Sequence, residues 1–125
     1  MESETKARYA AGLADDKKAS NIMILDVQGQ CTFTDFFLLC TGHSSLQLRA
    51  IAEGIESGLK KEHVLPLAVE GKGRSNWIVL DYGDVVVHVM NEEARSYYAL
   101  ENLWGDARVV TVRTRSVATS NAADS

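Results

Sequence analysis

The stretch "NWIVLDYGDVVVHVM", Asn76 to Met90, carries the strongest structural signal in this chain of 125 residues. Two runs rich in β-branched residues are separated by a tyrosine and a glycine, a pattern typical of a β-hairpin. With Tyr82 and Gly83 as the loop, the predicted cross-strand pairs are Asp81 with Asp84, Val79 with Val86, and Trp77 with His88. One side of the hairpin then carries Trp77, Val79, Asp81, Asp84, Val86 and His88, and the other carries Ile78, Leu80, Val85 and Val87.

The segments before the hairpin alternate between helical and extended patterns. Residues 3–18 hold apolar residues at helical spacing and predict a helix, whereas Ile22–Val27 is short and β-branched and predicts a strand. The sequence "CTFTDFFLLCTG", residues 31–42, has a centre that is apolar on both faces, which predicts a buried strand. Residues 65–71, "LPLAVEG", predict a further strand, with Pro66 near its start, where the missing N–H costs least.

A second helix is predicted to begin after Ser44, the N-cap of a capping box "SSLQ" that Gln47 completes. The apolar stripe of this helix consists of Leu48, Ile51, Ala52, Ile55 and Leu59. Gly54 and Gly58 lie inside this helix, and each weakens it by roughly 1 kcal/mol relative to alanine. Close packing against a neighbouring element is one reason for a helix to keep such glycines.

The last predicted helix begins at Asn91, a good N-cap, and ends at Gly105. Successive residues turn by about 100° around a helix, so each residue can be assigned to a face. By this assignment the core face consists of Ala99, Leu100 and Leu103, with Tyr97 and Trp104 at its edge. The polar face carries Arg95, Tyr98, Glu101 and Asn102.

The order of predicted elements is helix, strand, strand, helix, three strands and a final helix. This order indicates an α/β domain with a mixed β-sheet flanked by helices, and we place the domain at residues 1–107. Residues 108–125 are mostly polar or small, and we predict a disordered polar C-terminal tail there.

Charge and composition exclude several classes of function. Residues 1–106 contain 16 acidic and 10 basic residues, a net charge of −6, which disfavours a grip on nucleic-acid phosphates and favours a basic protein partner. No apolar run is long enough to cross a bilayer, and the N-terminal "MESETKARY" lacks the apolar core of a secretory signal. The two cysteines, Cys31 and Cys40, have no scaffold spacing, so we expect reduced thiols in a cytoplasmic protein.

The sequence offers little for catalysis, and we predict no enzyme activity, no metal and no cofactor. None of the histidines, His43, His63 and His88, has a second metal-type residue at ligand spacing. The stretch "EGKGRSN" has two glycines of a phosphate loop but leads into a strand. The stretch "CTGHSS" runs into a helix start that could hold an anion, yet the clustered carboxylates that carry Mg²⁺ against a triphosphate are missing. A nucleotide-binding enzyme is therefore the less favoured alternative.

The region from the hairpin to the last helix combines aromatic and acidic residues. Residues 77–106 hold six acids against Arg95 alone, together with two tryptophans and three tyrosines. Aromatic side chains are often only core, but inside an acidic rim they are also what a docking surface for a basic protein would use. The residues predicted to contact the partner are Trp77, Asp81, Tyr82, Asp84, Tyr98, Glu101 and Asn102. Tyr97 and Trp104 are assigned mainly to packing, as secondary candidates for contact.

Five blocks in order resemble the ribosomal silencing factor family, RsfS, also called Iojap or YbeB. They are "DKKASNIMILDV", "TDFFLLCTGHSSLQLRAIA", "PLAVEG", "NWIVLDYGDVVVHVM" and "RSYYALENLWGDA", and the likeness runs from about Leu13 to Ala107. Leu46 departs from the family, since members often have a polar residue there, and residues 108–125 extend beyond the shared core.

The resemblance implies a fold related to nucleotidyl transferases but without their catalytic residues. It implies binding to a basic protein on the joining face of the large ribosomal subunit, the fourteenth of that subunit's series (large-subunit protein fourteen). There a member obstructs docking of the small subunit and represses translation when nutrients are limiting. Members are often homodimers when free. A role as a late assembly factor for the large subunit would use the same docking surface.

Overall fold

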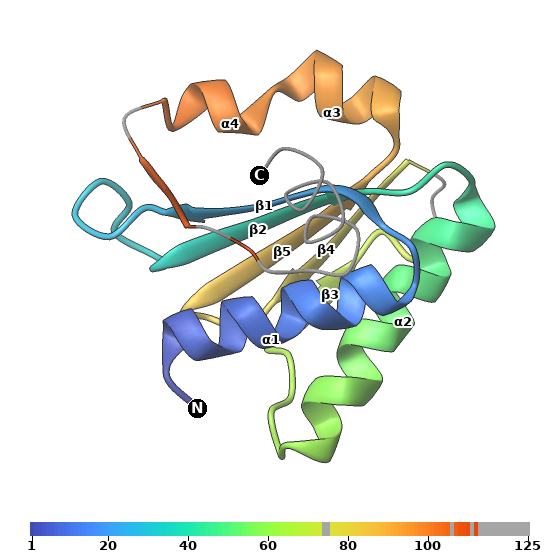
Figure 1. Ribbon diagram of the computed structural model, residues 1–125, viewed down its shortest axis with the longest axis horizontal. Helices are drawn as coiled ribbons and strands as arrows, with labels where there is room; N and C mark the ends of the chain where they lie inside the picture. Colours follow the sequence, from blue (N-terminus) through green and yellow to red (C-terminus); the bar gives the residue numbers. More distant parts are fainter. Residues whose placement is uncertain (74–75, 106, 111, 113–125) are drawn as a thin grey trace, which may run out of the picture.

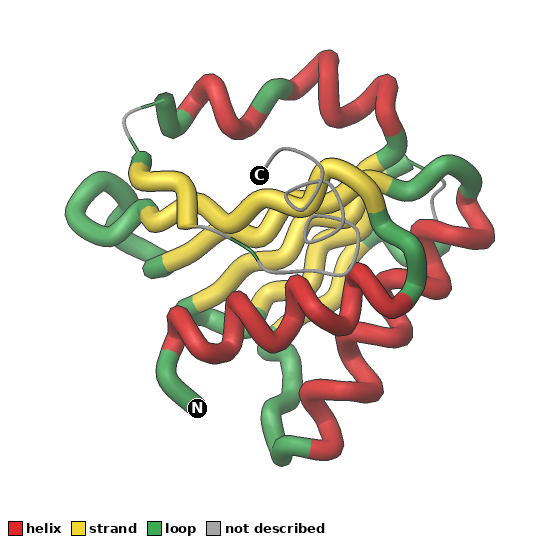
Figure 2. Tube along the Cα trace, viewed as in Figure 1, coloured by secondary structure: helices red, strands yellow, loops and turns green. Residues whose placement is uncertain are grey.

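A computed structural model of the chain describes residues 1–73, 76–105, 107–110 and 112 (Figure 1). The helices are α1 (Ser3–Asp16), α2 (Ser45–Lys61), α3 (Glu92–Tyr98) and α4 (Leu100–Leu103). The strands are β1 (Ser20–Asp26), β2 (Phe36–Thr41), β3 (Ala68–Glu70), β4 (Trp77–Asp81), β5 (Val85–Met90) and β6 (Arg108–Val110). The predicted order is confirmed up to β5, but the last predicted helix is broken in two and a strand follows it (Figure 2).

The strands form one sheet in the order β3-β4-β5-β2-β1-β6. β2 and β5 pair in parallel, and every other described pair is antiparallel. Helices α1 and α2 cover one face of the sheet, and α3 and α4 lie over the other (Figure 1). The prediction of an α/β domain with a mixed sheet flanked by helices is confirmed.

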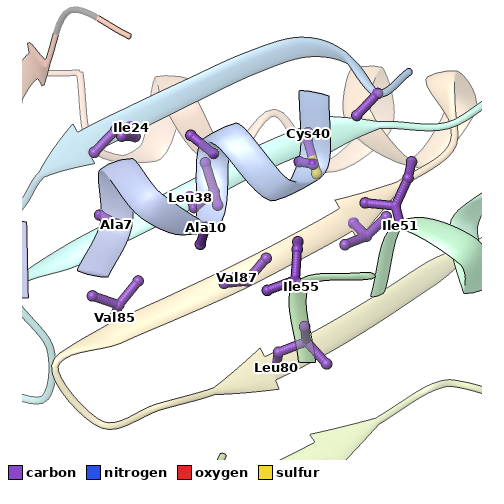
Figure 3. Close-up of a cluster of buried hydrophobic side chains, with 14 of the residues drawn as sticks. Ala7, Ala10, Ile24, Leu38, Cys40, Ile51, Ile55, Leu80, Val85 and Val87 are labelled. Carbon is purple, nitrogen blue, oxygen red and sulfur yellow. The ribbon is translucent and has the colours of Figure 1, made fainter. Parts of the chain in front are cut away.

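The face under α1 and α2 is closed by small residues and tight contacts. Figure 3 shows Ala7 and Ala10 of α1 beside the strand residues Leu38 and Val87, all four of them completely buried. The two helices also touch each other closely. A Cβ atom on Gly58 of α2 would overlap the side chain of Leu13 of α1, and one on Gly54 would lie 2.9 Å from Cε of Lys17. The glycines of α2 are therefore explained by the close approach of α1.

The hairpin register differs by two residues from the prediction. The observed pairs are Trp77 with Met90, Val79 with His88, and Asp81 with Val86. The loop consists of Gly83 and Asp84, because Tyr82 N donates to Val85 O at 2.9 Å. Gly83 has a φ of 87°, which suits the first central position of a hairpin turn, and its N–H donates to Asp81 Oδ1 at 2.8 Å.

Moving the loop by one residue shifts the pairing register by two residues. Every cross-strand pair therefore changes, but each strand residue keeps its predicted face, because side chains alternate with a period of two. Trp77, Val79 and Asp81 therefore still share a side with Val86 and His88, as predicted. Asp84 alone leaves that side, because it lies in the turn.

The two predicted N-caps are confirmed. Ser44 Oγ accepts from Gln47 N at 3.0 Å, and Asn91 Oδ1 accepts from Ala94 N at 2.8 Å. The reciprocal half of the capping box is displaced by one residue, because Gln47 Oε1 accepts from His43 N at 2.7 Å instead of from Ser44 N.

The prediction of one continuous final helix is wrong. Ala99 has a left-handed conformation (φ 46°, ψ 52°) that ends α3 and turns the chain into α4. Residues after the break follow a new axis, so the assignment of faces fails there. Leu103, predicted to be core, is 71% exposed, whereas Leu100 packs against the sheet as predicted.

The first residues of the predicted tail belong to the sheet. Arg108–Val110 pairs with β1 as strand β6, and Arg108 forms an ion pair with Asp26 at 2.8 Å. The disorder prediction is wrong for these three residues, because two valines meet the otherwise unpaired edge of β1. The rest of the predicted tail, apart from Val112, lies outside the described residues. Within the described part, no helix has the length and apolar character needed to cross a membrane.

Candidate functional site

The face of the sheet under α3 and α4 has its own apolar cluster. Its buried members are Leu25, Val27, Phe37, Leu39 and Val86. Partly buried residues packed on them are Met23, Cys31, Val79, Leu100, Trp104 and Ala107. Two short helices cover this face, of seven and four residues, and they leave several apolar side chains in contact with solvent.

Six rings on this face form a continuous series, here called the aromatic row. In order along the series they are Tyr97, Tyr98, Trp77, His88, Phe37 and Trp104. The centroids of successive rings lie 4.9, 4.6, 5.8, 5.4 and 5.6 Å apart. These separations are those of interacting aromatic pairs, so the row connects α3, β4, β5, β2 and the C-cap of α4 through ring contacts.

The aromatic row passes from the surface into the interior. Tyr97 is 81% exposed and Tyr98 is 49% exposed, Trp77 is half-buried, and His88 is buried. The expectation that Tyr97 mainly packs is wrong, because Tyr97 follows Glu93 by four residues and shares the solvent side of α3 with it. The structure thus brings Trp77 and Tyr98 together, as the prediction of a shared surface requires, and adds Tyr97 to them.

Two other predicted contact residues lie on α4 beside this end of the row. Asn102 is exposed, and Glu101 is half-buried, with its carboxylate 3.2 Å from Nε of Arg95. Both residues line a hollow of about 540 Å³ between α3, α4 and β1. This hollow shares Ser96 with the groove that Tyr97 and Tyr98 line.

The remaining predicted contact residues lie elsewhere. Asp81 is four residues from Trp77 along β4, a separation of about 13 Å. Asp84 lies in the hairpin turn and pairs with Lys6 of α1 at 2.7 Å. Tyr82 is only 6% exposed and packs in the core under α1 and α2, where burial and the neighbouring Glu56 raise its pKa to about 12.

Three residues that the sequence reading did not assign to the site have central positions in it. His88 was expected to be an ordinary histidine, yet Trp77 Nε1 donates to its Nδ1 at 3.1 Å. Burial lowers the pKa of His88 to about 4. Phe37 links His88 to Trp104. Its place in an apolar strand indicated burial but not which face it would occupy.

Arg95 was placed on a polar helix face and is in fact 8% exposed. Its Nη1 donates to Asn21 O at 2.9 Å and to Thr41 Oγ1 at 3.0 Å, while its Nε faces Glu101. Arg95 thus fastens α3 and α4 to strands β1 and β2. No local sequence pattern could indicate this, because the partners in the strands are 74 and 54 residues away.

A groove of about 700 Å³ opens beside the exposed end of the aromatic row. It is lined by Asn76, Glu92, Glu93, Ala94, Ser96, Tyr97 and Tyr98. Glu92 lies 3.7 Å from His43, and Glu93 has no ion-pair partner among the residues that the structure describes. The groove therefore combines exposed carboxylates with the side chains of two tyrosines.

The described part of the chain offers little for catalysis. No group of three or more His, Cys, Asp or Glu residues there could hold a metal ion. At the "CTGHSS" helix start, the N–H groups of His43 and Gln47 are already bonded to Gln47 Oε1 and Ser44 Oγ. Burial raises the pKa of the Cys40 thiol to about 12, so Cys40 is not a thiolate at neutral pH.

Comparison with known proteins identifies the family. Residues 1–125 match the family described as "Ribosomal silencing factor during starvation". The chain belongs to the RsfS family. It is 41% identical to the ribosomal silencing factor RsfS of Bacillus subtilis over 107 residues, which cover 86% of this chain and 91% of that protein.

Two further relatives extend the comparison. A crystal structure of a Chromobacterium violaceum protein superposes with a TM-score of 0.82 and 34% identity, over 84% of this chain and 88% of that one. A mouse protein named "Mitochondrial assembly of ribosomal large subunit protein 1" is 30% identical over 95 residues, covering 74% of this chain and 42% of the mouse protein. The fold is thus shared with the bacterial protein, and the sequence similarity extends to a protein with a mitochondrial name.

Proposed function

We propose that this RsfS-family protein silences ribosomes by binding the large subunit through the exposed end of the aromatic row and obstructing the small subunit. The partner is a basic protein of the joining face, large-subunit protein fourteen, as the family resemblance implies. The observation that carries the proposal is the pair formed by Tyr98 and Trp77, whose ring centroids are 4.6 Å apart while Tyr98 is 49% exposed. The function involves no chemical step.

The charge around this surface supports a basic partner. Between Trp77 and Gly105 the acids are Asp81, Asp84, Glu92, Glu93 and Glu101. The basic residue of that segment is Arg95, which is buried and paired with Glu101. Within that segment, no described residue is an exposed cation, and a surface rich in exposed carboxylates attracts positively charged partners and disfavours phosphate backbones.

The tyrosines and the tryptophan supply the contact energy in this proposal. Large rings near the centre of an interface often lose 2 kcal/mol or more of binding free energy when truncated to alanine, which is about thirtyfold in Kd. Trp77 and Tyr98 are already packed on each other, so little side-chain entropy is lost when a partner covers them. The surface consists of Trp77, Glu92, Glu93, Tyr97, Tyr98, Glu101 and Asn102. The sequence also predicted contacts from Asp81, Tyr82 and Asp84. The proposed surface does not include these three residues.

The experiment is co-sedimentation of purified large subunits with wild type, Tyr98→Ala and Trp77→Ala. The matched control is Tyr9→Ala, because Tyr9 is an exposed tyrosine on α1, on the other side of the sheet. We expect both test variants to lose binding and inhibition of subunit joining, and Tyr9→Ala to keep them. Wild-type binding by both Tyr98→Ala and Trp77→Ala would refute the proposal.

A role in assembly of the large subunit is the second candidate, and the name of the mouse relative favours it. It requires the same contact with the large subunit and does not exclude silencing. Depletion of the protein in its host separates the two roles. Immature large particles in growing cells indicate assembly, whereas normal particles with excessive subunit joining during starvation indicate silencing.

The relation to nucleotidyl transferases and the homodimer of the free protein stay predictions of the resemblance. Calorimetric titration with nucleoside triphosphates and Mg²⁺ tests the enzyme alternative, since the proposed function expects no heat of binding. Sedimentation equilibrium of the free protein tests the dimer.

A further inference from the structure

We infer that His88 is a positioning residue: its Nδ1 accepts the Trp77 indole N–H and so holds Trp77 in the orientation that supports Tyr98 for docking. The inference rests on the proposed function, because it concerns how the docking surface is kept in shape. It goes beyond that function by giving a task to a buried residue that no partner can touch.

The geometry begins with an offset pair on the hairpin. Trp77 is directly opposite Met90, and His88 is directly opposite Val79, so Trp77 and His88 are diagonal neighbours on one face. Diagonal positions are within reach of large aromatic side chains. The 3.1 Å hydrogen bond from Trp77 Nε1 therefore requires the indole to lean along the ribbon toward His88.

The chemistry of the bond defines the state of the histidine. An indole N–H can only donate, so Nδ1 of His88 must carry a lone pair, and in the neutral ring the proton resides on Nε2. That Nε2 is buried and has no hydrogen-bond partner in the described part of the chain. A buried N–H without an acceptor costs free energy, and an aliphatic residue on this central strand would avoid the cost.

In return for this cost, His88 keeps the rings of the aromatic row in a fixed arrangement. His88 is fixed between Phe37 and Trp77, with ring centroids 5.4 and 5.8 Å away. Trp77 in turn supports Tyr98, and Tyr98 contacts Tyr97. Trp77 is only half-buried, and its ring contacts with Tyr98 and His88 do not by themselves set the direction of the indole N–H. The hydrogen bond to His88 sets that direction before a partner arrives, and such preorganisation improves affinity.

The test compares His88→Leu with His88→Asn. Leucine removes both the unpartnered N–H and the acceptor, whereas the Oδ1 atom of asparagine can occupy the place of Nδ1 and accept from the indole. We expect His88→Leu to unfold at a higher temperature than wild type and yet to bind large subunits about tenfold more weakly, as expected when a preorganised anchor is freed. His88→Asn should be the less stable variant and the better binder. A residue that served stability alone would not give these opposite orders.

A spectroscopic signature completes the test. The chain has two tryptophans, so in a Trp104→Phe background the near-ultraviolet circular dichroism of tryptophan reports on Trp77. Within that background we expect the signal to fall in His88→Leu and to persist in His88→Asn.

The outcomes separate this inference from the proposed function. Wild-type affinity in a folded His88→Leu, with Tyr98→Ala still deficient, overturns the role of His88 and leaves the docking surface intact. Should His88→Leu not fold, His88→Asn decides the matter: loss of both the Trp77 signal and affinity in the folded protein contradicts the inference. Wild-type binding by Tyr98→Ala and Trp77→Ala rejects the proposed function itself.

Discussion

The two faces of the one sheet are built from different side chains and are finished in different ways. Under α1 and α2 the strands present mostly aliphatic residues, with Phe36 among them. The helices close over them with alanines, and glycines of α2 allow α1 to approach closely (Figure 3). Under α3 and α4 the strands present Phe37, Trp77 and His88, and two short helices leave tyrosines exposed. The closed face supplies the stability on which the open face depends for its shape.

This comparison predicts that the largest loss of stability comes from the closed face. Leu38 lies on β2 and is completely buried under α1, so Leu38→Ala should lower the free energy of unfolding by roughly 2–5 kcal/mol. Tyr98→Ala, on the open face, should change it by less than about 1 kcal/mol. Urea unfolding measures the free energy of unfolding of both variants. Equal losses would contradict the hypothesis that the closed face supplies stability and the open face binds the partner.

Acid should lower the free energy of unfolding through His88, which lies on the open face. Burial lowers the pKa of His88 to about 4, so between pH 6.5 and pH 4 the unfolded chain binds a proton that the folded protein does not. His88 therefore contributes a loss of roughly 3 kcal/mol as the pH falls through that range, and no loss above pH 6.5. Urea unfolding at pH 7 and pH 4.5 should show a steeper decline for wild type than for His88→Asn. Parallel declines would contradict the depressed pKa.

Two glycines in the helices of the closed face should give smaller changes in stability, and the sign of the change should differ between them. A Cβ atom on Gly12 of α1 would meet nothing within 4 Å, so Gly12→Ala should stabilise the protein by about 1 kcal/mol through helix propensity. Gly58→Ala gains the same propensity but overlaps Leu13, and overpacking typically costs 1–3 kcal/mol, so we expect it to be neutral or destabilising. Thermal unfolding of the two variants gives the answer, and equal stabilisation would show that α1 and α2 are not in close contact.

The smallest expected effect is electrostatic and concerns the open face alone. Glu93→Gln should slow association with large subunits a few-fold at low salt, and the difference should fade as salt screens the charges. Glu53→Gln, which changes an exposed glutamate on α2, should have no such effect. Stopped-flow association rates at several salt concentrations test this, and the same response in both variants would show that only net charge matters.

Some structural features could be predicted because they depend on short-range patterns. The alternation of the hairpin assigned Trp77 and His88 to one face, and this survived a wrong loop position because the shift was by two residues. The caps Ser44 and Asn91 were recognised because a capping hydrogen bond spans only three residues.

Other features depend on contacts between distant residues and could not be read from local patterns. The break at Ala99 allows Glu101 to reach Arg95, which is itself held by Asn21 and Thr41. The exposure of Leu103 was predicted wrongly for the same reason, since its face was assigned on one straight helix, whereas Tyr97 precedes the break and lies on the solvent side of α3. The strand at Arg108–Val110 exists because β1 offers an edge to pair with.

The sequence by itself determined the order of the elements up to β5, the α/β class, the acidic character of the region around the docking surface and the membership of the RsfS family. Only the tertiary structure decided that Trp77, His88, Phe37 and the two tyrosines form one row, and that Asp84 and Tyr82 lie apart from it. The physical reason is that periodicity and capping act over a few residues. A shared surface, in contrast, is set by the register of strands and by buried hydrogen bonds that join residues far apart in the chain.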